Sequence, residues 1–166
     1  LGTGSFNTLR RNVSFGSGLL NNKFTLDGRL SRITSDGYID RGSADLNSYY
    51  LSGAYIGKSS SLRFNLFSGH EVTYQAWNGV PAAMIDDPET RTFNSAGTAK
   101  PGEPYENEVD DYVQTHYQLL YDAEVSDTWQ LSLALHYTKG FGFFENYEGG
   151  AFMPSFNLSP VTIGGE

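Results

Sequence analysis

The sequence has no cysteine and no long hydrophobic run, and each absence excludes a class of structure. Without cysteine the chain has neither a disulfide framework nor a thiolate metal site. No stretch approaches the roughly 18 to 20 consecutive apolar residues of a membrane-spanning helix, so only a β-barrel would allow this chain to cross a bilayer. With 6 prolines in 166 residues and 39 % hydrophobic residues, the composition indicates a folded chain of one domain's length.

Sequence motifs of catalysis are also missing. The chain contains no nucleophile elbow, P-loop, dinucleotide-binding fingerprint or HExxH pair, and no group of its carboxylates has the spacing of an EF-hand. We therefore predict that the protein is not an enzyme and holds neither a cofactor nor a metal. The net charge of −8 also makes nucleic acid an unfavourable partner.

Aromatic residues, in contrast, make up 14 % of the chain, with 11 Tyr and 11 Phe. The stretch from Val113 to Tyr137 shows how they are arranged. If it folds as a hairpin that turns at Val125, one face is almost wholly apolar and the other is mostly polar and small. The apolar face pairs Val113 with Tyr137, Thr115 with Leu135, Tyr117 with Leu133, Leu119 with Leu131 and Tyr121 with Trp129.

The same two-faced pattern occurs twice more. One hairpin joins strands at 8–20 and 24–33 through the turn at 21–23, and another joins strands at 49–56 and 61–73 around residues 57–60. With the strands at 112–123 and 129–139, the sequence predicts six antiparallel strands in three hairpins. Phe15 and Phe64 each lie opposite a glycine, Gly28 and Gly53 respectively, and are expected to cover it.

The predicted connections are short at one end of the strands and long at the other, where they comprise residues 34–48, 75–111 and 140–166. Aromatic residues also collect at both strand ends, as the interfacial girdles of a membrane barrel do. These features favour a transmembrane barrel, whose apolar face contacts lipid. A soluble β-sandwich is the alternative, because its core also holds aromatic residues.

Five segments resemble the barrel of TonB-dependent outer-membrane receptors, and together they cover nearly the whole chain. They are GSFNTLRRNVSFGSGLL (4–20), RLSRITSDGYIDR (29–41), YQAWNGVP (74–81), RTFNSAG (91–97) and HYTKGFGFFENYE (136–148). The resemblance implies an all-β, up-and-down transmembrane barrel segment, in which residues 1–166 supply about six of 22 strands. Neither the plug domain nor the TonB box of the family is recognisable, and the start at Leu1 without Met or signal peptide leads us to expect a mature or excised segment.

The resemblance also implies a location and a function. The protein is expected in the outer membrane of a Gram-negative bacterium, where it would bind a scarce ligand such as a ferric siderophore and import it to the periplasm. Its partners would be that small iron chelate, outer-membrane lipid, and the TonB complex through the absent plug. A passive or structural barrel without energy coupling is the competing interpretation.

The long connections carry the candidate ligand-binding residues. Residues 75–111 hold eight acids against Arg91 and Lys100, a charge that suits cationic ligands or simply keeps a surface loop soluble. Aromatic residues outside the predicted strands, or at their long-loop end, are candidates for ligand stacking or for packing of loops. These residues are Trp77, Phe93, Tyr105, Tyr112, Phe141, Phe143, Phe144 and Tyr147.

Two further sets of polar residues stand out. Gln114, His116 and His136 are predicted to face the barrel lumen, with the two histidines as diagonal neighbours; two ligands do not make a metal site, so ordinary hydrogen bonding is expected there. Arg11 and Arg32 are predicted to lie opposite each other on the apolar face, at the long-loop end. They would contact lipopolysaccharide phosphate, or else extend into solvent.

Overall fold

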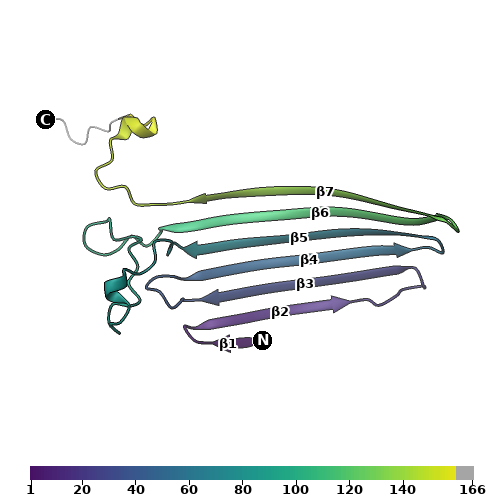
Figure 1. The fold of residues 1–166 in the computed structure, drawn as a ribbon, viewed down its shortest axis with the longest axis horizontal. Helices are drawn as coiled ribbons and strands as arrows, with labels where there is room; N and C mark the ends of the chain where they lie inside the picture. Colours follow the sequence, from purple (N-terminus) through teal and green to yellow (C-terminus); the bar gives the residue numbers. More distant parts are fainter. Residues whose placement is uncertain (160–166) are drawn as a thin grey trace.

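The chain forms one antiparallel sheet of seven strands, each hydrogen-bonded to its neighbour in sequence (Figure 1). The structure is a computed structural model that describes residues 1–159. The strands are β1 (Gly2–Gly4), β2 (Thr8–Gly16), β3 (Phe24–Ser35), β4 (Ala44–Ile56), β5 (Ser60–Tyr74), β6 (Val109–Ser126) and β7 (Trp129–Phe144). Two short 3-10 helices, η1 (Ala82–Met84) and η2 (Met153–Phe156), lie in the connection after β5 and beyond β7. The predicted all-β, up-and-down meander is therefore confirmed.

The three connections predicted to be long, after β3, β5 and β7, lie at one end of the sheet, and the turns from β2 to β3, β4 to β5 and β6 to β7 lie at the other end (Figure 1). The sorting by length is weaker than predicted, because the β3–β4 connection has only eight residues and the three-residue β1–β2 turn lies at the long-loop end. In the β2–β3 turn, Asn21 and Asn22 both adopt the left-handed conformation, which asparagine tolerates better than most residues. Leu20 and Phe24 close this turn as an isolated bridge, although the strand before it ends at Gly16 and not at residue 20.

The register of the first two hairpins agrees with the prediction. Phe15 pairs with Gly28 and Val13 with Leu30, while Leu51 pairs with Leu66. These two registers could be predicted from the sequence because short turns fix the pairing and a one-residue slip would move every apolar side chain to the other face.

The register of the third hairpin was predicted wrongly. Its turn lies at Asp127 and Thr128 and not at Val125, so Leu119 pairs with Leu135, not Leu131. The turn uses polar residues, the Thr128 amide donating to the Ser126 hydroxyl, whereas the β-branched Val125 stays in the strand beside a bulge. The shift is an even number of residues, so each side chain keeps the face that was predicted for it.

Several strands extend further into the long connections than expected. β4 begins at Ala44 and not at Tyr49, β6 begins at Val109, and β7 continues to Phe144, so parts of the predicted loops 34–48, 75–111 and 140–166 belong to the sheet. In β4 the outward side chains become polar, as Asn47 and Asp45, so hydrophobic alternation does not reveal that backbone pairing continues there. β1 was not predicted at all.

One face of the sheet, which we call the outer face, carries rows of apolar side chains that run across the strands. One such row is Phe15, Gly28, Leu51, Leu66, Tyr117 and Tyr137. Along β6 the mostly apolar rows extend from Ala123 to Thr115, about 26 Å at roughly 3.3 Å per residue, and the last of them also contains Ser68 and Lys139. Beyond them, at the long-loop end, the next row is partly charged and contains Arg11, Arg32, Asn47 and His70.

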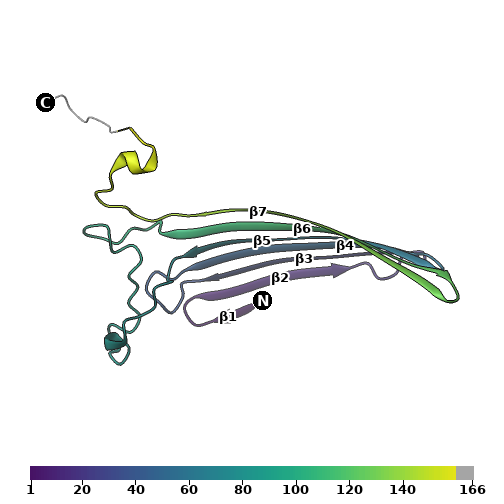
Figure 2. The same cartoon turned by 45° about the horizontal axis from the view of Figure 1, so that its top comes forward.

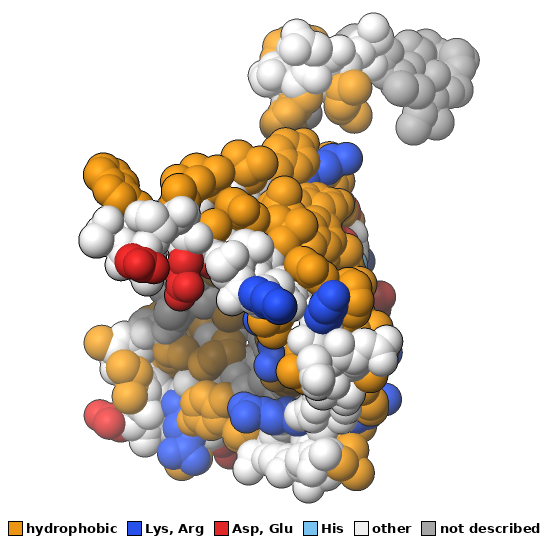
Figure 3. All heavy atoms as spheres, turned by 90° about the vertical axis from the view of Figure 1, so that its right-hand side faces the viewer, with side chains coloured by type: hydrophobic (Ala, Val, Ile, Leu, Met, Phe, Trp, Pro, Cys, Tyr) orange, Lys and Arg blue, Asp and Glu red, His pale blue; other side chains and the backbone are white. Residues whose placement is uncertain are grey.

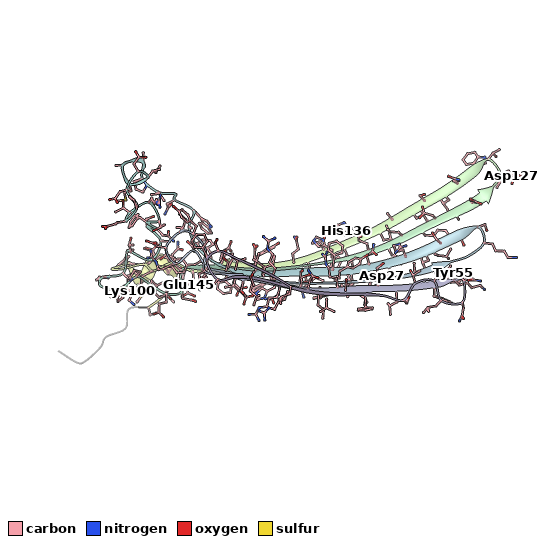
Figure 4. All side chains as sticks on the ribbon, turned by 90° about the horizontal axis from the view of Figure 1, so that it is seen from below. Asp27, Tyr55, Lys100, Asp127, His136 and Glu145 are labelled. Atoms are coloured by element: carbon pink, nitrogen blue, oxygen red, sulfur yellow. The ribbon has the colours of Figure 1, made fainter. Side chains whose placement is uncertain are left out.

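The opposite face, which we call the inner face, is polar and better shielded. The row next to the one above is Ser14, Arg29, Tyr50, Phe67, His116 and Thr138. The strands bow along their length (Figure 2), and His136 lies on the inner side of the bow (Figure 4). Seen from the short-turn end, apolar side chains crowd the upper and right-hand border, and charged ones lie toward the hollowed middle (Figure 3).

Within residues 1–159 no second layer covers the outer face. Only three hydrophobic residues are buried, Ala54, Tyr74 and Ala96, whereas Leu135 and Tyr137 on the outer face are 68 % and 62 % exposed. In this part of the chain no helix is both long and apolar enough to cross a membrane.

The two glycines expected to lie under aromatic rings differ. The Phe15 ring covers Gly28 as predicted, but the atom nearest to a Cβ built on Gly53 is the Thr25 carbonyl oxygen, at 3.9 Å, so Phe64 leaves that glycine uncovered. Tyr112 instead covers Gly140 and Gly142 on the inner face, a pairing hidden by the misplaced register.

Candidate functional site

A hollow of about 830 Å³ on the inner face is the candidate binding site. Arg29, Tyr50, Phe67, Tyr112 and His116 are among the residues that line it, and Gly69 leaves its floor open, with no atom within 4 Å of a Cβ built there. The Phe67 ring stacks on the His116 imidazole, with 4.6 Å between centroids and 23° between planes. Aromatic walls with a few polar groups are typical of small-molecule sites.

The predicted lumen residues come together beside this hollow. His116 Nδ1 lies 3.4 Å from His136 Nε2, and the Thr138 hydroxyl is 2.9 Å from the first nitrogen and 2.7 Å from the second. The histidines are diagonal neighbours as predicted, and the register error left this relation intact because both registers place them two residues apart on facing strands.

One choice of tautomers gives the histidine cluster a consistent set of hydrogen bonds. His116 Nε2 donates to Gln114 Oε1 over 3.1 Å, the Thr138 hydroxyl donates to His116 Nδ1, and His136 Nε2 donates to the Thr138 oxygen. Among residues 1–159 no group of three or more His, Asp or Glu side chains is placed to hold a metal ion.

A ladder of polar side chains continues the inner face toward the short-turn end. The buried Ser52 hydroxyl donates to Asn65 Oδ1 over 2.8 Å, and Asn65 Nδ2 donates to Gln118 Oε1 over 3.2 Å. Arg63 also donates to Ser52, over 3.1 Å. These cross-strand bonds hold the side chains of β4, β5 and β6 in fixed positions below the hollow.

At the long-loop end, Glu145 ties the β5–β6 connection to the end of β7. Its carboxylate accepts hydrogen bonds from the Tyr105 hydroxyl and, over 2.8 Å, from Asn107 Nδ2, while its carbonyl accepts from Gln75 Nε2 over 3.1 Å. The Tyr105 bond lowers the pKa of Glu145, with a further contribution from Asn107, and the same carboxylate raises the pKa of Tyr105. Nothing in the sequence pattern marked Glu145, because its partner Tyr105 is 40 residues away.

A second anchor joins the β5–β6 connection to the β3–β4 connection. The buried Asn94 side chain donates to the carbonyls of Asp40 and Gln75, and Arg41 donates to those of Asn94 and Ala96 over 2.6 and 2.8 Å. The Arg41 guanidinium also lies over the Tyr74 ring, 5.7 Å from its centroid. The predicted acidic loop is thus tied to the sheet at both ends, and its last two acids, Asp110 and Asp111, belong to β6.

The structure does not gather the eight predicted aromatic residues into one site. Trp77 packs edge-on against Phe144 at 6.0 Å, and Tyr105 packs against Tyr147 at 5.7 Å, so both pairs connect the β5–β6 connection with the chain at or after the end of β7. Phe93 is in the same connection but in neither pair. Tyr112 lines the inner hollow.

Two of those predicted residues lie on the opposite face. Phe141 and Phe143 are in β7, not in a loop, and alternate onto the outer face with Tyr137. They therefore point away from the inner hollow. Phe67 and Thr138 were not predicted as site residues. Alternation along β5 and along β7 nevertheless places both side chains on the inner face, together with His116 and His136.

Arg11 and Arg32 lie opposite each other on the outer face, as predicted. The sequence reading missed Asp45, which receives both hydrogen bonds of the Arg32 fork, at 2.9 and 2.5 Å. The predicted strand begins at Tyr49, five residues after the true start of β4 at Ala44, so Asp45 falls outside it. A similar pair, His70 with Asp111 at 2.8 Å, lies nearby at the same end.

No protein-family model, curated protein or solved structure matches this chain.

Proposed function

We propose that this chain is part of the wall of a TonB-dependent outer-membrane receptor, which binds a scarce ligand such as an iron chelate and imports it. The supporting observation is the two-faced sheet. Its mostly apolar rows extend about 26 Å along the strands, with Lys139 in the last row, and this span is close to the roughly 25 Å apolar band of outer-membrane barrels. The long connections at one end only would form the extracellular face.

The sheet edges fit the same proposal. Within residues 1–159, β7 has no strand on its far side, and no strand lies beyond β1 and β2 on the other side. In hydrocarbon each unpaired backbone group costs several kcal/mol, so further strands would have to complete the barrel. The sequence resemblance implies about 22 strands in all, with a plug in the lumen.

The inner hollow supplies the ligand contacts in this proposal. Phe67, stacked on His116, gives a flat aromatic surface, while Arg29 and Glu71 place one charge of each sign at the same hollow. A planar chelate matches the aromatic surface, and its anionic groups would bind on the Arg29 side. The anchored loops would then form the extracellular entrance.

Uptake of a labelled ferric siderophore under iron limitation tests the proposal. Cells that lack the gene should lose uptake and regain it with the full-length gene, and cells that lack TonB should show no gene-dependent uptake. Gene-dependent uptake that persists without TonB would identify a passive barrel instead. No dependence on the gene, across a panel of iron chelates, would refute the import function.

A matched pair of variants locates the ligand site. Phe67→Ala removes the stacking surface on the inner face, and Leu66→Ala makes a similar truncation on the outer face. We expect Phe67→Ala to weaken ligand binding about tenfold and Leu66→Ala to leave it unchanged, because a stacked contact contributes roughly 0.5–1.5 kcal/mol beyond its buried area. Titration of purified receptor with the chelate measures both.

A further inference from the structure

The outer face has a hollow of its own, of about 990 Å³, where the apolar rows meet the charged row. Val13, Leu30, Tyr49 and Val113 form its apolar part, while Arg11, Arg32, Asn47 and His70 form its polar side. A concave surface that is apolar toward the middle of the sheet and cationic at one border suits an amphiphile with an anionic head.

The basic side chains at this border differ in whether an acidic side chain already binds them. Asp45 binds both nitrogens of the Arg32 fork, and Asp111 faces His70. Arg11 is exposed and makes no side-chain hydrogen bond or ion pair with any of residues 1–159. Arg11 is therefore the arginine of this border whose guanidinium has no hydrogen-bonded partner among residues 1–159, although the negative charge of Asp45 also acts on it.

We infer that this hollow binds a membrane lipid whose headgroup bears phosphate, with the phosphate at Arg11 and acyl chains over Val13, Leu30 and Tyr49. A guanidinium binds phosphate through two parallel hydrogen bonds, and acyl chains would cover side chains that the protein leaves exposed. The inference rests on the proposed function, which places this end of the sheet in the outer leaflet, where the phosphorylated lipid is lipopolysaccharide.

Asp45 has a definite role in this arrangement. It occupies the Arg32 fork and so directs the lipid phosphate to Arg11. Removing its charge should free Arg32 as a second phosphate ligand, and lipid binding should become stronger. This gain distinguishes a phosphate site from a purely apolar groove, which would not respond to Asp45.

Binding of fluorescent lipid A to the full-length protein in detergent micelles tests the inference. Arg11→Glu should weaken binding about tenfold, the size of one lost charge-assisted hydrogen bond. Arg10→Glu is the matched control, since it makes the same charge change at the adjacent residue on the inner face, and should have no effect. Asp45→Asn should strengthen binding severalfold.

Dephosphorylated lipid A and inorganic phosphate distinguish the possible ligands of this hollow. Dephosphorylated lipid A should bind the native protein about as weakly as lipid A binds the Arg11→Glu variant. Equal losses in the Arg10 and Arg11 variants, or no loss in either, would overturn the inference. So would full competition by millimolar inorganic phosphate, which would indicate a free-anion site. Because binding uses purified protein, it can succeed or fail independently of the iron-uptake assay.

Discussion

The two faces of this sheet reverse the usual relation between polarity and burial. On the outer face of the central strands, Leu51 and Leu119 are 38 % and 37 % exposed, while on the inner face the polar Ser52 and Asn65 are 1 % and 9 % exposed. Water-soluble domains bury apolar rows against a second layer because exposure costs about 25 cal/mol per Å². The contrast indicates that the outer face requires an apolar environment that residues 1–159 do not provide.

A charge placed on each face in turn gives the largest expected effect. Leu119 and Leu120 are adjacent residues of β6 that point to the outer and inner face respectively. If the outer face contacts lipid, Leu119→Arg should lower the free energy of unfolding in bilayer vesicles by about 2–4 kcal/mol. Urea titration of the full-length protein reconstituted in vesicles measures this loss.

Leu120→Arg is the control for that experiment. It adds the same charge beside the first site but on the polar face, opposite Arg63, where repulsion should cost less than about 1 kcal/mol. Equal losses for the two variants would mean that both faces meet the same solvent, and the membrane proposal would be wrong.

A smaller difference is expected between two glycines of the outer face. Gly28→Ala places a methyl group where the Phe15 ring now lies, and displacement of the ring should cost about 1–2 kcal/mol. Gly53→Ala meets only the Thr25 carbonyl oxygen at 3.9 Å, and should stabilise the strand by roughly 0.5 kcal/mol. Unfolding titrations of the two variants measure the change in the free energy of unfolding. A loss of stability in Gly53→Ala would contradict the observed packing of the apolar rows.

The anchor of the β5–β6 connection should produce a local effect. Glu145→Gln leaves one of its two donors, Tyr105 or Asn107, with a weaker partner, so amide hydrogen exchange in residues 97–108 should become severalfold faster. Exchange in the middle of β6 should not change. The control is Glu148→Gln, because Glu148 makes no side-chain hydrogen bond within the described chain.

The same anchor should respond to pH at both extremes. Since the pKa of Glu145 is lowered from 4.5, its contribution is complete above that value and is lost as pH falls through the lowered pKa. Since the pKa of Tyr105 is raised from 10.0, the contribution of its hydroxyl is complete below that value and is lost as pH rises through the raised pKa.

Trp77 fluorescence is a direct readout of this pH response, because Trp77 packs on Phe144, the residue before Glu145. In a Trp129→Phe background the signal should be constant between about pH 5 and 9 and change on both sides. Glu145→Gln should remove the acid transition and Tyr105→Phe the alkaline one. A signal insensitive to either variant would show that the anchor does not hold the loop.

The inner-face site was partly accessible from sequence. The side-chain period of two placed Gln114, His116 and His136 on one face, and this survived an error of four residues in register because the error was even. Phe67, which stacks on His116, is 49 residues away from it, and only the pairing of β5 with β6 brings the two rings together. Thr138 has no titratable group and belongs to no motif, so the sequence contains no signal for its place between the two histidines.

The sequence alone determined the meander, the order of its turns and the separation of polar from apolar faces, because these depend on local periodicity and on short turns that fix register. Tertiary structure decided which charges remain available and how the long connections are held. Asp45 neutralises Arg32, while Glu145 ties the β5–β6 connection to the end of β7 and Asn94 ties it to the β3–β4 connection. Such contacts join residues that lie far apart in sequence or on separate strands, so no local pattern could reveal them.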